Sequence, residues 1–204
     1  MSRTVKKVEI FTLRDGEDII KVLTPPYDYV EDKFRFGLAS AKVDNLWGLI
    51  DEDGNEICVP KYNYFGTPNK WGYAVCSSNG LCGIYSYKER KQIIRPKYKT
   101  ICSYQEEYNH FIVEATNGKK GIVRPDGFEV IVPMKYDCIE NKPNGIFGFE
   151  YGIAFVENRD NFLHPLRGCI DLEGNEIIKL QEAGPASKFW NDFYELRNKL
   201  SKRA

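Results

Sequence analysis

LWGLIDEDGNEICVPKY, residues 46–62, has the pattern of two short strands joined by a tight turn. Asp53 and Gly54 supply the turn, because glycine reaches positive φ without a Cβ clash and aspartate hydrogen-bonds the local backbone. The residues before the turn are apolar on both alternating faces, which predicts a strand that is covered on both sides. Pro60 has no N–H group, so it marks a strand end or a sheet edge. Gly48 has no side chain, so another segment can approach its backbone closely.

Degraded copies of this stretch recur along the chain, which predicts a repeat protein. Gly83, Gly121 and Gly168 follow Gly48 at spacings of 35, 38 and 47 residues. A second glycine lies six residues after Gly48, Gly121 and Gly168. A segment that begins with proline and ends with tyrosine follows Gly48, Gly83 and Gly121. The repeat anchors are Trp47, Gly48, Gly54, Gly83, Gly121, Gly127, Gly168, Gly174, Pro60, Pro96 and Pro133.

The segment from Trp47 to Ile57, followed by Pro60-Lys61-Tyr62, resembles the WG (KWG) repeat of bacterial proteins. The resemblance covers roughly residues 5–180, although Cys82 replaces the tryptophan in the third copy and the first copy lacks the Trp-Gly pair. Such repeats are β-rich and occur mostly in proteins of unknown function, so the resemblance implies a non-catalytic binding role. The chain is also similar, more faintly, to cell-wall-binding hairpin repeats, which share its spacing of aromatic residues and glycines. The aromatic pairs that hold choline in those repeats are not evident in this sequence.

The expected fold is all-β, with tandem meanders of three or four antiparallel strands in an open curved array. A small β-propeller is the alternative, because propeller blades also stack sheets that are apolar on both faces. The repeat domain is expected to span residues 1–183, in about five copies at 3–30, 34–65, 70–104, 109–140 and 151–180.

The period of the sequence changes after Pro185, where an amphipathic helix is predicted within residues 184–204. Its apolar stripe is Phe189, Phe193, Leu196 and Leu200. Two interpretations stay open for this helix. It caps the apolar end of the last repeat, or it docks a partner protein.

Composition excludes several classes of protein. Aromatic residues make up 14% of the chain, and 29 Lys and Arg residues balance 29 Asp and Glu residues. The chain therefore has no net electrostatic field that would attract nucleic acid or a membrane, and neither is expected as a partner. The N-terminal residues lack the apolar run of a signal peptide, which predicts a cytoplasmic protein. The six cysteines fall at apolar repeat positions, as expected of small core residues in a reducing compartment.

Catalytic and metal-binding chemistry finds little support in the sequence, so we expect no enzyme activity, no metal and no cofactor. The acidic turns that start at Asp51 and Asp171 lack the further ligands of a calcium loop and are first of all hairpin turns. Nothing in the spacing requires Cys76 or Cys102 to contact His110 as a nucleophile and base would. The basic residues within 88–99 suggest a solvated repeat edge, with contact to a polyanion as the alternative.

The function predicted from these observations is a protein-interaction module or scaffold, whose partner is another protein. Repeat arrays present broad surfaces, and their variable loops carry recognition. The candidate binding residues are the loop aromatics Tyr64, Phe65, Trp71, Tyr104, Tyr108, Phe147 and Phe149. The alternative function is a carbohydrate or cell-envelope binding module that stacks sugars on exposed aromatic residues.

Overall fold

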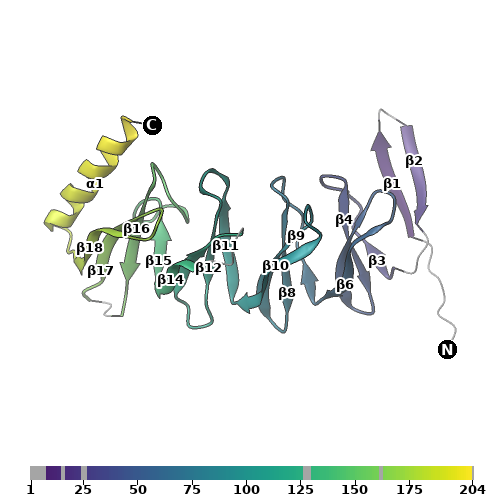
Figure 1. The fold of residues 1–204 in the computed structure, drawn as a ribbon, viewed down its shortest axis with the longest axis horizontal. Helices are drawn as coiled ribbons and strands as arrows, with labels where there is room; N and C mark the ends of the chain where they lie inside the picture. Colours follow the sequence, from purple (N-terminus) through teal and green to yellow (C-terminus); the bar gives the residue numbers. More distant parts are fainter. Residues whose placement is uncertain (1–7, 15–16, 24–26, 126–129, 161–162, 204) are drawn as a thin grey trace. The chain divides into compact units, whose positions relative to one another are not determined.

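The computed structural model describes the whole chain except residues 1–7, 15–16, 24–26, 126–129, 161–162 and 204. It divides into two compact units, Met1–Lys97 and Tyr98–Ala204. The expected all-β fold with tandem meanders and a C-terminal helix is confirmed (Figure 1). In each of the four larger sheets every strand is hydrogen-bonded to its neighbour in sequence. The expected anchor Gly127 lies outside the described residues.

The first unit contains a hairpin and two four-stranded sheets. The hairpin pairs β1 (Val8–Arg14) with β2 (Glu17–Leu23) in antiparallel register. The 29–62 sheet contains β3 (Tyr29–Val30), β4 (Leu38–Val43), β5 (Leu46–Asp51) and β6 (Glu56–Tyr62). The 64–98 sheet contains β7 (Tyr64–Phe65), β8 (Tyr73–Ser78), β9 (Leu81–Ser86) and β10 (Lys91–Tyr98).

The second unit contains two further sheets and the helix. The 100–136 sheet contains β11 (Thr100–Gln105), β12 (His110–Glu114), β13 (Lys120–Val123) and β14 (Val130–Tyr136), with the short 3-10 helix η1 (Glu106–Tyr108) between β11 and β12. The 138–182 sheet contains β15 (Cys138–Glu140), β16 (Ile153–Asn158), β17 (Leu166–Asp171) and β18 (Glu176–Glu182). A helix, α1 (Lys188–Ser201), ends the unit.

The repeated glycines face the last strand of their sheets, and a β-bulge accompanies Gly48, Gly121 and Gly168. The register between β5 and β6 shifts between Trp47 and Leu49, on either side of Gly48. A Cβ on Gly48 would overlap the carbonyl oxygen of Cys58 and lie 2.7 Å from the nitrogen of Pro60. Gly83 and Gly121 meet the equivalent backbone of β10 and β14. Glycine is therefore required because the bulged strand leaves no room for a side chain.

The tight turns use the aspartate that precedes them rather than the one inside them. Asp51 Oδ1 accepts hydrogen bonds from the backbone N–H groups of Asp53 and Asn55, at 2.9 and 2.8 Å. Asp171 accepts the same pair of bonds in the last sheet. Gly54 lies at φ +80°, which confirms the expected left-handed position.

Exit tyrosines connect each sheet to the next within a unit. The hydroxyl of buried Tyr62, at the end of β6, donates to Gln92 Oε1 in β10 at 2.7 Å. Tyr136, at the end of β14, donates in the same way to Glu176 Oε1 in β18 at 3.2 Å. Burial raises the pKa of both phenols, so each one remains a neutral donor.

Helix α1 packs on the 138–182 sheet, beside β17 and β18 (Figure 1). Phe189 and Phe193 are buried against Phe155 of β16, and Leu196 and Leu200 join the same cluster. The whole predicted stripe is therefore turned onto the sheet, as a cap requires. Ser187 occupies the N-cap position with extended φ and ψ, but its side chain forms no capping hydrogen bond.

Candidate functional site

A groove in the second unit brings together residues from two sheets. One wall is β11 and the start of η1, residues 102–107, and the other is Ile146 and Phe147 from the connection between β15 and β16. We call it the β11 groove. Its volume is about 460 Å³, which lies within the range of roughly 300–1,000 Å³ that is typical of ligand sites.

Gln105 fixes the connection against the end of β11. Its side-chain amide accepts from the Phe149 N–H at 2.7 Å and donates to the Phe149 carbonyl at 3.2 Å. A Cβ on the neighbouring Gly148, which lies at φ +129°, would overlap this amide. The absence of a side chain at Gly148 thus allows the two walls to meet.

Residues 146–148 add one bridged position to the outer edge of β15. Phe147 forms an antiparallel bridge with Glu140, flanked by hydrogen bonds from Asn141 N to Ile146 O at 3.0 Å and from Gly148 N to Ile139 O at 3.2 Å. In this pattern the N–H and C=O groups of the bridged residue point away from its partner strand. The backbone of Phe147 therefore points away from β15.

Buried aromatic rings support the connection from below. Phe149 is buried, and its ring packs edge-on against Tyr108 and His110, with centroids 5.8 and 5.9 Å apart. The Tyr108 hydroxyl accepts a hydrogen bond from the Gly152 N–H at 3.3 Å. Burial raises the pKa of Tyr108. Tyr104 packs on Phe111 at 4.6 Å, and its hydroxyl donates to Asn109 Oδ1.

Two apolar side chains of the same connection remain exposed. Ile146 is 72% exposed and Phe147 is 38% exposed, although both belong to a segment that is held by backbone hydrogen bonds. Lys120 Nζ lies 5.7 Å from the centre of the Phe147 ring. The same lysine lies 3.3 Å from a Glu114 oxygen, so its charge is balanced locally. The two side chains are adjacent in sequence and form a small apolar patch, and contiguous apolar patches mark interaction sites.

The three other candidate aromatics lie in the first unit, and the structure does not gather them into one site. Tyr64 is 55% exposed, whereas Phe65 is buried between Tyr62 and Tyr85 in the core. Trp71 is half-buried, with Lys70 Nζ 5.0 Å from the centre of its ring. Four of the seven candidates, Tyr104, Tyr108, Phe147 and Phe149, therefore converge on the second unit.

Sequence reasoning did not identify Gln105 or Ile146 as site residues. Gln105 contacts a residue 44 positions away, which no local pattern indicates. The sequence signal at this position is NGIFGF, residues 144–149, in which two glycines flank a pair of apolar residues in a loop.

The thiols are poorly suited to nucleophilic catalysis. All six cysteines are thiols rather than disulfides. Burial raises the pKa of Cys76 to about 12 and also raises that of Cys102. A raised pKa disfavours the thiolate, which is the reactive form. Across the described part of the chain, no group of three or more His, Cys, Asp or Glu side chains is placed to hold a metal ion.

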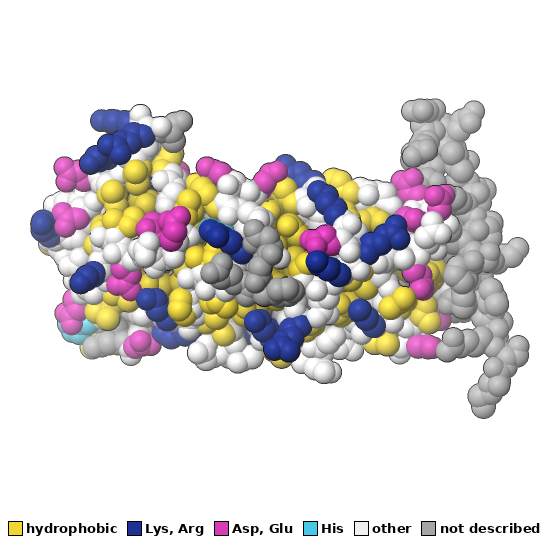
Figure 2. Space-filling model, in the orientation of Figure 1, with side chains coloured by type: hydrophobic (Ala, Val, Ile, Leu, Met, Phe, Trp, Pro, Cys, Tyr) yellow, Lys and Arg dark blue, Asp and Glu magenta, His cyan; other side chains and the backbone are white. Residues whose placement is uncertain are grey.

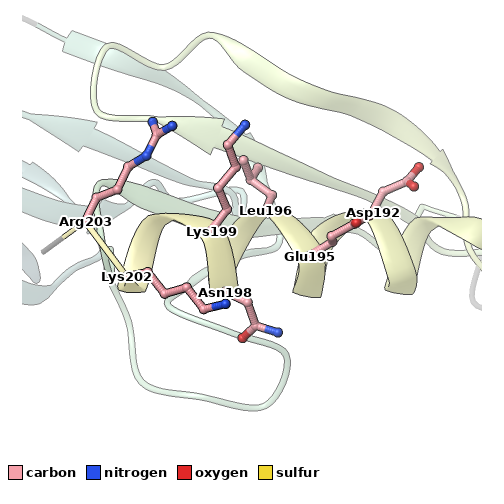
Figure 3. Close-up of a pocket in the computed structure, with 7 residues that line it drawn as sticks. All are labelled: Asp192, Glu195, Leu196, Asn198, Lys199, Lys202 and Arg203. Atoms are coloured by element: carbon pink, nitrogen blue, oxygen red, sulfur yellow. The ribbon is translucent and has the colours of Figure 1, made fainter.

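Two other hollows lie in the second unit. The larger, of about 720 Å³, is lined by residues of α1 and by the two residues that follow it, with Asp192 and Glu195 toward one end and Lys199, Lys202 and Arg203 toward the other (Figure 3). This order matches the helix dipole and does not form a converging site.

The smaller hollow, of about 180 Å³, lies under Trp190. There the buried Glu157 accepts hydrogen bonds from Arg159 and from Arg167 Nε, the latter at 2.8 Å. Arg167 also lies 5.2 Å from the Trp190 ring and donates to the Ala183 carbonyl. Arg167, held by Glu157, thus links the sheet to α1 through the Trp190 ring.

The face of the molecule in Figure 2 carries no single-sign field. On its described part, Lys and Arg side chains are mixed with Asp and Glu side chains. Within the basic stretch 88–99, Lys91 pairs with Glu89 at 2.7 Å and Lys99 pairs with Glu114 at 2.7 Å. None of the described helices is long and apolar enough to cross a membrane.

Comparisons with known proteins leave the family open. No protein-family model matches the chain, and no curated protein matches it. Solved structures with some similarity include HIRA(644-1017), with 10% identity over 63% of this chain and a TM-score of 0.39. The WD40 domain of Toxoplasma gondii coronin matches with 10% identity over 74% and a TM-score of 0.38, and the WD40 β-propeller domain of Doa1 with 10% over 88% and 0.36.

This chain covers 45%, 46% and 62% of those three structures. At such identities and TM-scores the similarity assigns neither a fold nor a function. What the topology itself shows is a β-repeat protein with a C-terminal helix.

Proposed function

We propose that this chain is a non-catalytic protein-interaction module of the WG-repeat type, which acts in the cytoplasm and binds another protein at the β11 groove. One observation carries the proposal. Ile146 and Phe147 are exposed beside the groove, on a segment that Gln105 and the β15 bridge hold in one position. Preorganised apolar anchors of this kind contribute most of the binding free energy at protein interfaces.

The thiols do not support the catalytic alternative, because four of the six cysteines are buried and burial raises the pKa of Cys76 and of the half-buried Cys102. A carbohydrate-binding role would need exposed aromatic platforms, and all three tryptophans are half-buried. Trp47 packs on Tyr29 with ring centres 5.7 Å apart, and Trp190 stacks on Phe155 at 6.2 Å. The tryptophans therefore do not favour that second function.

The test compares affinity capture from a lysate of the source organism by three baits. These are the intact chain, a double variant with Ile146→Ser and Phe147→Ser, and a control with Ile177→Ser. Ile177 is 46% exposed on β18, so the control removes an exposed apolar side chain from the same unit away from the groove.

A captured protein is identified, purified and mixed with each bait in a calorimetric titration. We expect binding to the intact chain and to the control, and at least tenfold weaker binding to the double variant. Equal binding to all three baits, or no protein that binds the intact chain, would refute the proposed function.

A further inference from the structure

The connection that carries Phe147 already has one residue paired by a peptide-like group. At Phe149 the N–H and C=O groups are both bonded by the side-chain amide of Gln105, which has the same donor and acceptor as a peptide group. Gly148, at φ +129°, bends the chain between Phe147 and Phe149, so the two residues do not form one continuous strand edge. The protein thus places a peptide-like group of its own beside this connection.

Phe147 precedes this bend, at the outer edge of β15, and it lines the groove. Its bridge to Glu140 uses the backbone groups of Ile139, Asn141, Ile146 and Gly148, and not those of Phe147 itself. A partner peptide group would therefore pair with the N–H and C=O groups of Phe147, which face away from β15. A groove of about 460 Å³ has room for a few extended residues, each of which advances about 3.3 Å.

The lining of the groove specifies the side chains of such a segment. Its charged members are Glu106 and Glu107, both exposed, and it contains no lysine or arginine. Its exposed apolar members, Ile146 and Phe147, lie on the opposite wall. Side chains alternate between the two faces of a strand, so a suitable ligand alternates apolar and basic residues.

We infer that the β11 groove binds an extended, basic peptide segment of the partner protein as an additional strand, paired through the backbone of Phe147. This inference rests on the proposed function and adds the chemical class of the partner segment. Main-chain hydrogen bonds give affinity in this mode of recognition, and alternate side chains give specificity.

The probe is a fluorescein-labelled heptapeptide in which valine alternates with lysine and arginine, titrated with the full chain by fluorescence anisotropy. A charge-reversed peptide, with glutamate at the basic positions, is the first control. A set of basic peptides, each N-methylated at one amide, tests strand pairing. We expect saturable binding of the basic peptide and at least tenfold weaker binding of the charge-reversed one. N-methylation is expected to weaken binding at alternate positions only.

Two protein variants separate the side chain of Phe147 from its backbone. Phe147→Ala removes the ring and keeps the N–H, whereas Phe147→Pro removes both. The N–H of Phe147 makes none of the bridge bonds, so the proline variant is expected to fold, which its thermal unfolding and amide spectrum check. We expect the proline variant to bind the basic peptide at least fivefold more weakly than the alanine variant.

Failure of this inference differs from failure of the proposed function. If the basic peptide binds but N-methylation and Phe147→Pro have no extra effect, strand pairing is wrong. If neither peptide binds while a purified partner still binds the intact chain and not the groove variant, the inference is overturned and the interaction site stands. If that partner binds every variant equally, the proposed function is wrong as well.

Discussion

Replacing Gly121 with alanine should destabilise the second unit far more than the same change at Gly184. A Cβ at Gly121 would overlap the carbonyl oxygen of Val132 and lie 3.0 Å from a Pro133 backbone carbon. These are backbone atoms, so β14 must shift as a whole. Overpacking costs about 1–3 kcal/mol, and a strained ladder hydrogen bond adds about 1 kcal/mol. We therefore expect a loss of about 3 kcal/mol in the free energy of unfolding.

Two matched glycines in the same unit calibrate this value. The nearest backbone atom to a Cβ on Gly168 is the Ile178 oxygen at 2.8 Å, in an exit strand without proline, so a loss of about 1–2 kcal/mol is expected. Nothing lies within 4 Å of a Cβ on Gly184, and a change within about 0.5 kcal/mol is expected.

Urea unfolding of the full chain, followed by circular dichroism, measures all three variants. The midpoint should fall in the order Gly184→Ala, Gly168→Ala, Gly121→Ala. Equal stability of the Gly121 and Gly184 variants, or a larger loss at Gly168 than at Gly121, would refute the role that we assign to the bulge.

Three further results are expected. Glu157→Gln should lower the free energy of unfolding by about 2–3 kcal/mol, because it leaves two arginines without their buried counter-charge; a loss below about 1 kcal/mol in urea would contradict this. Hydrogen bonds from lysines lower the pKa of Glu114 and Glu176. The stability that these two carboxylates contribute is therefore complete above their ordinary pKa of 4.5, and it is lost as the pH falls through their lowered pKa in the folded protein. A urea midpoint that stays constant down to pH 3 would exclude this contribution. Burial raises the pKa of Cys76 and Cys169 to about 12, so iodoacetamide at pH 7 should modify them only after urea unfolding, and rapid modification of the native chain would be inconsistent with their burial.

The sequence predicted the features that depend on backbone sterics. The close approach expected at Gly48 is confirmed, and Pro60 lies in β6, an edge strand of its sheet. Both residues act through the presence or absence of backbone and Cβ atoms, so residue type alone is sufficient evidence. The helical stripe was equally predictable from its period, and the structure resolves its orientation by packing Phe189 and Phe193 on the adjacent sheet.

Features that depend on side-chain hydrogen bonds were harder to predict. The expectation that Asp53 organises the turn is corrected by the structure, in which Asp51 accepts the turn's hydrogen bonds. The sequence is compatible with either aspartate as the acceptor. The backbone direction at the end of β5 decides which side chain faces the N–H groups of the turn. Aromatic residues likewise looked equivalent in sequence, yet Phe149 is buried and Phe147 is exposed two residues earlier.

The proposed site lies where the repeat is interrupted, and this placement has a physical reason. The spacing from Gly121 to Gly168 is 47 residues, against 35 and 38 between the earlier anchors. Part of the additional length is the connection between β15 and β16, which carries Ile146 and Phe147. Residues inside the repeat are constrained by the bulge, the turn and the stacked core, so a change there costs stability. The inserted residues carry no such constraint beyond the bonds that position them, and they can therefore present apolar side chains to a partner.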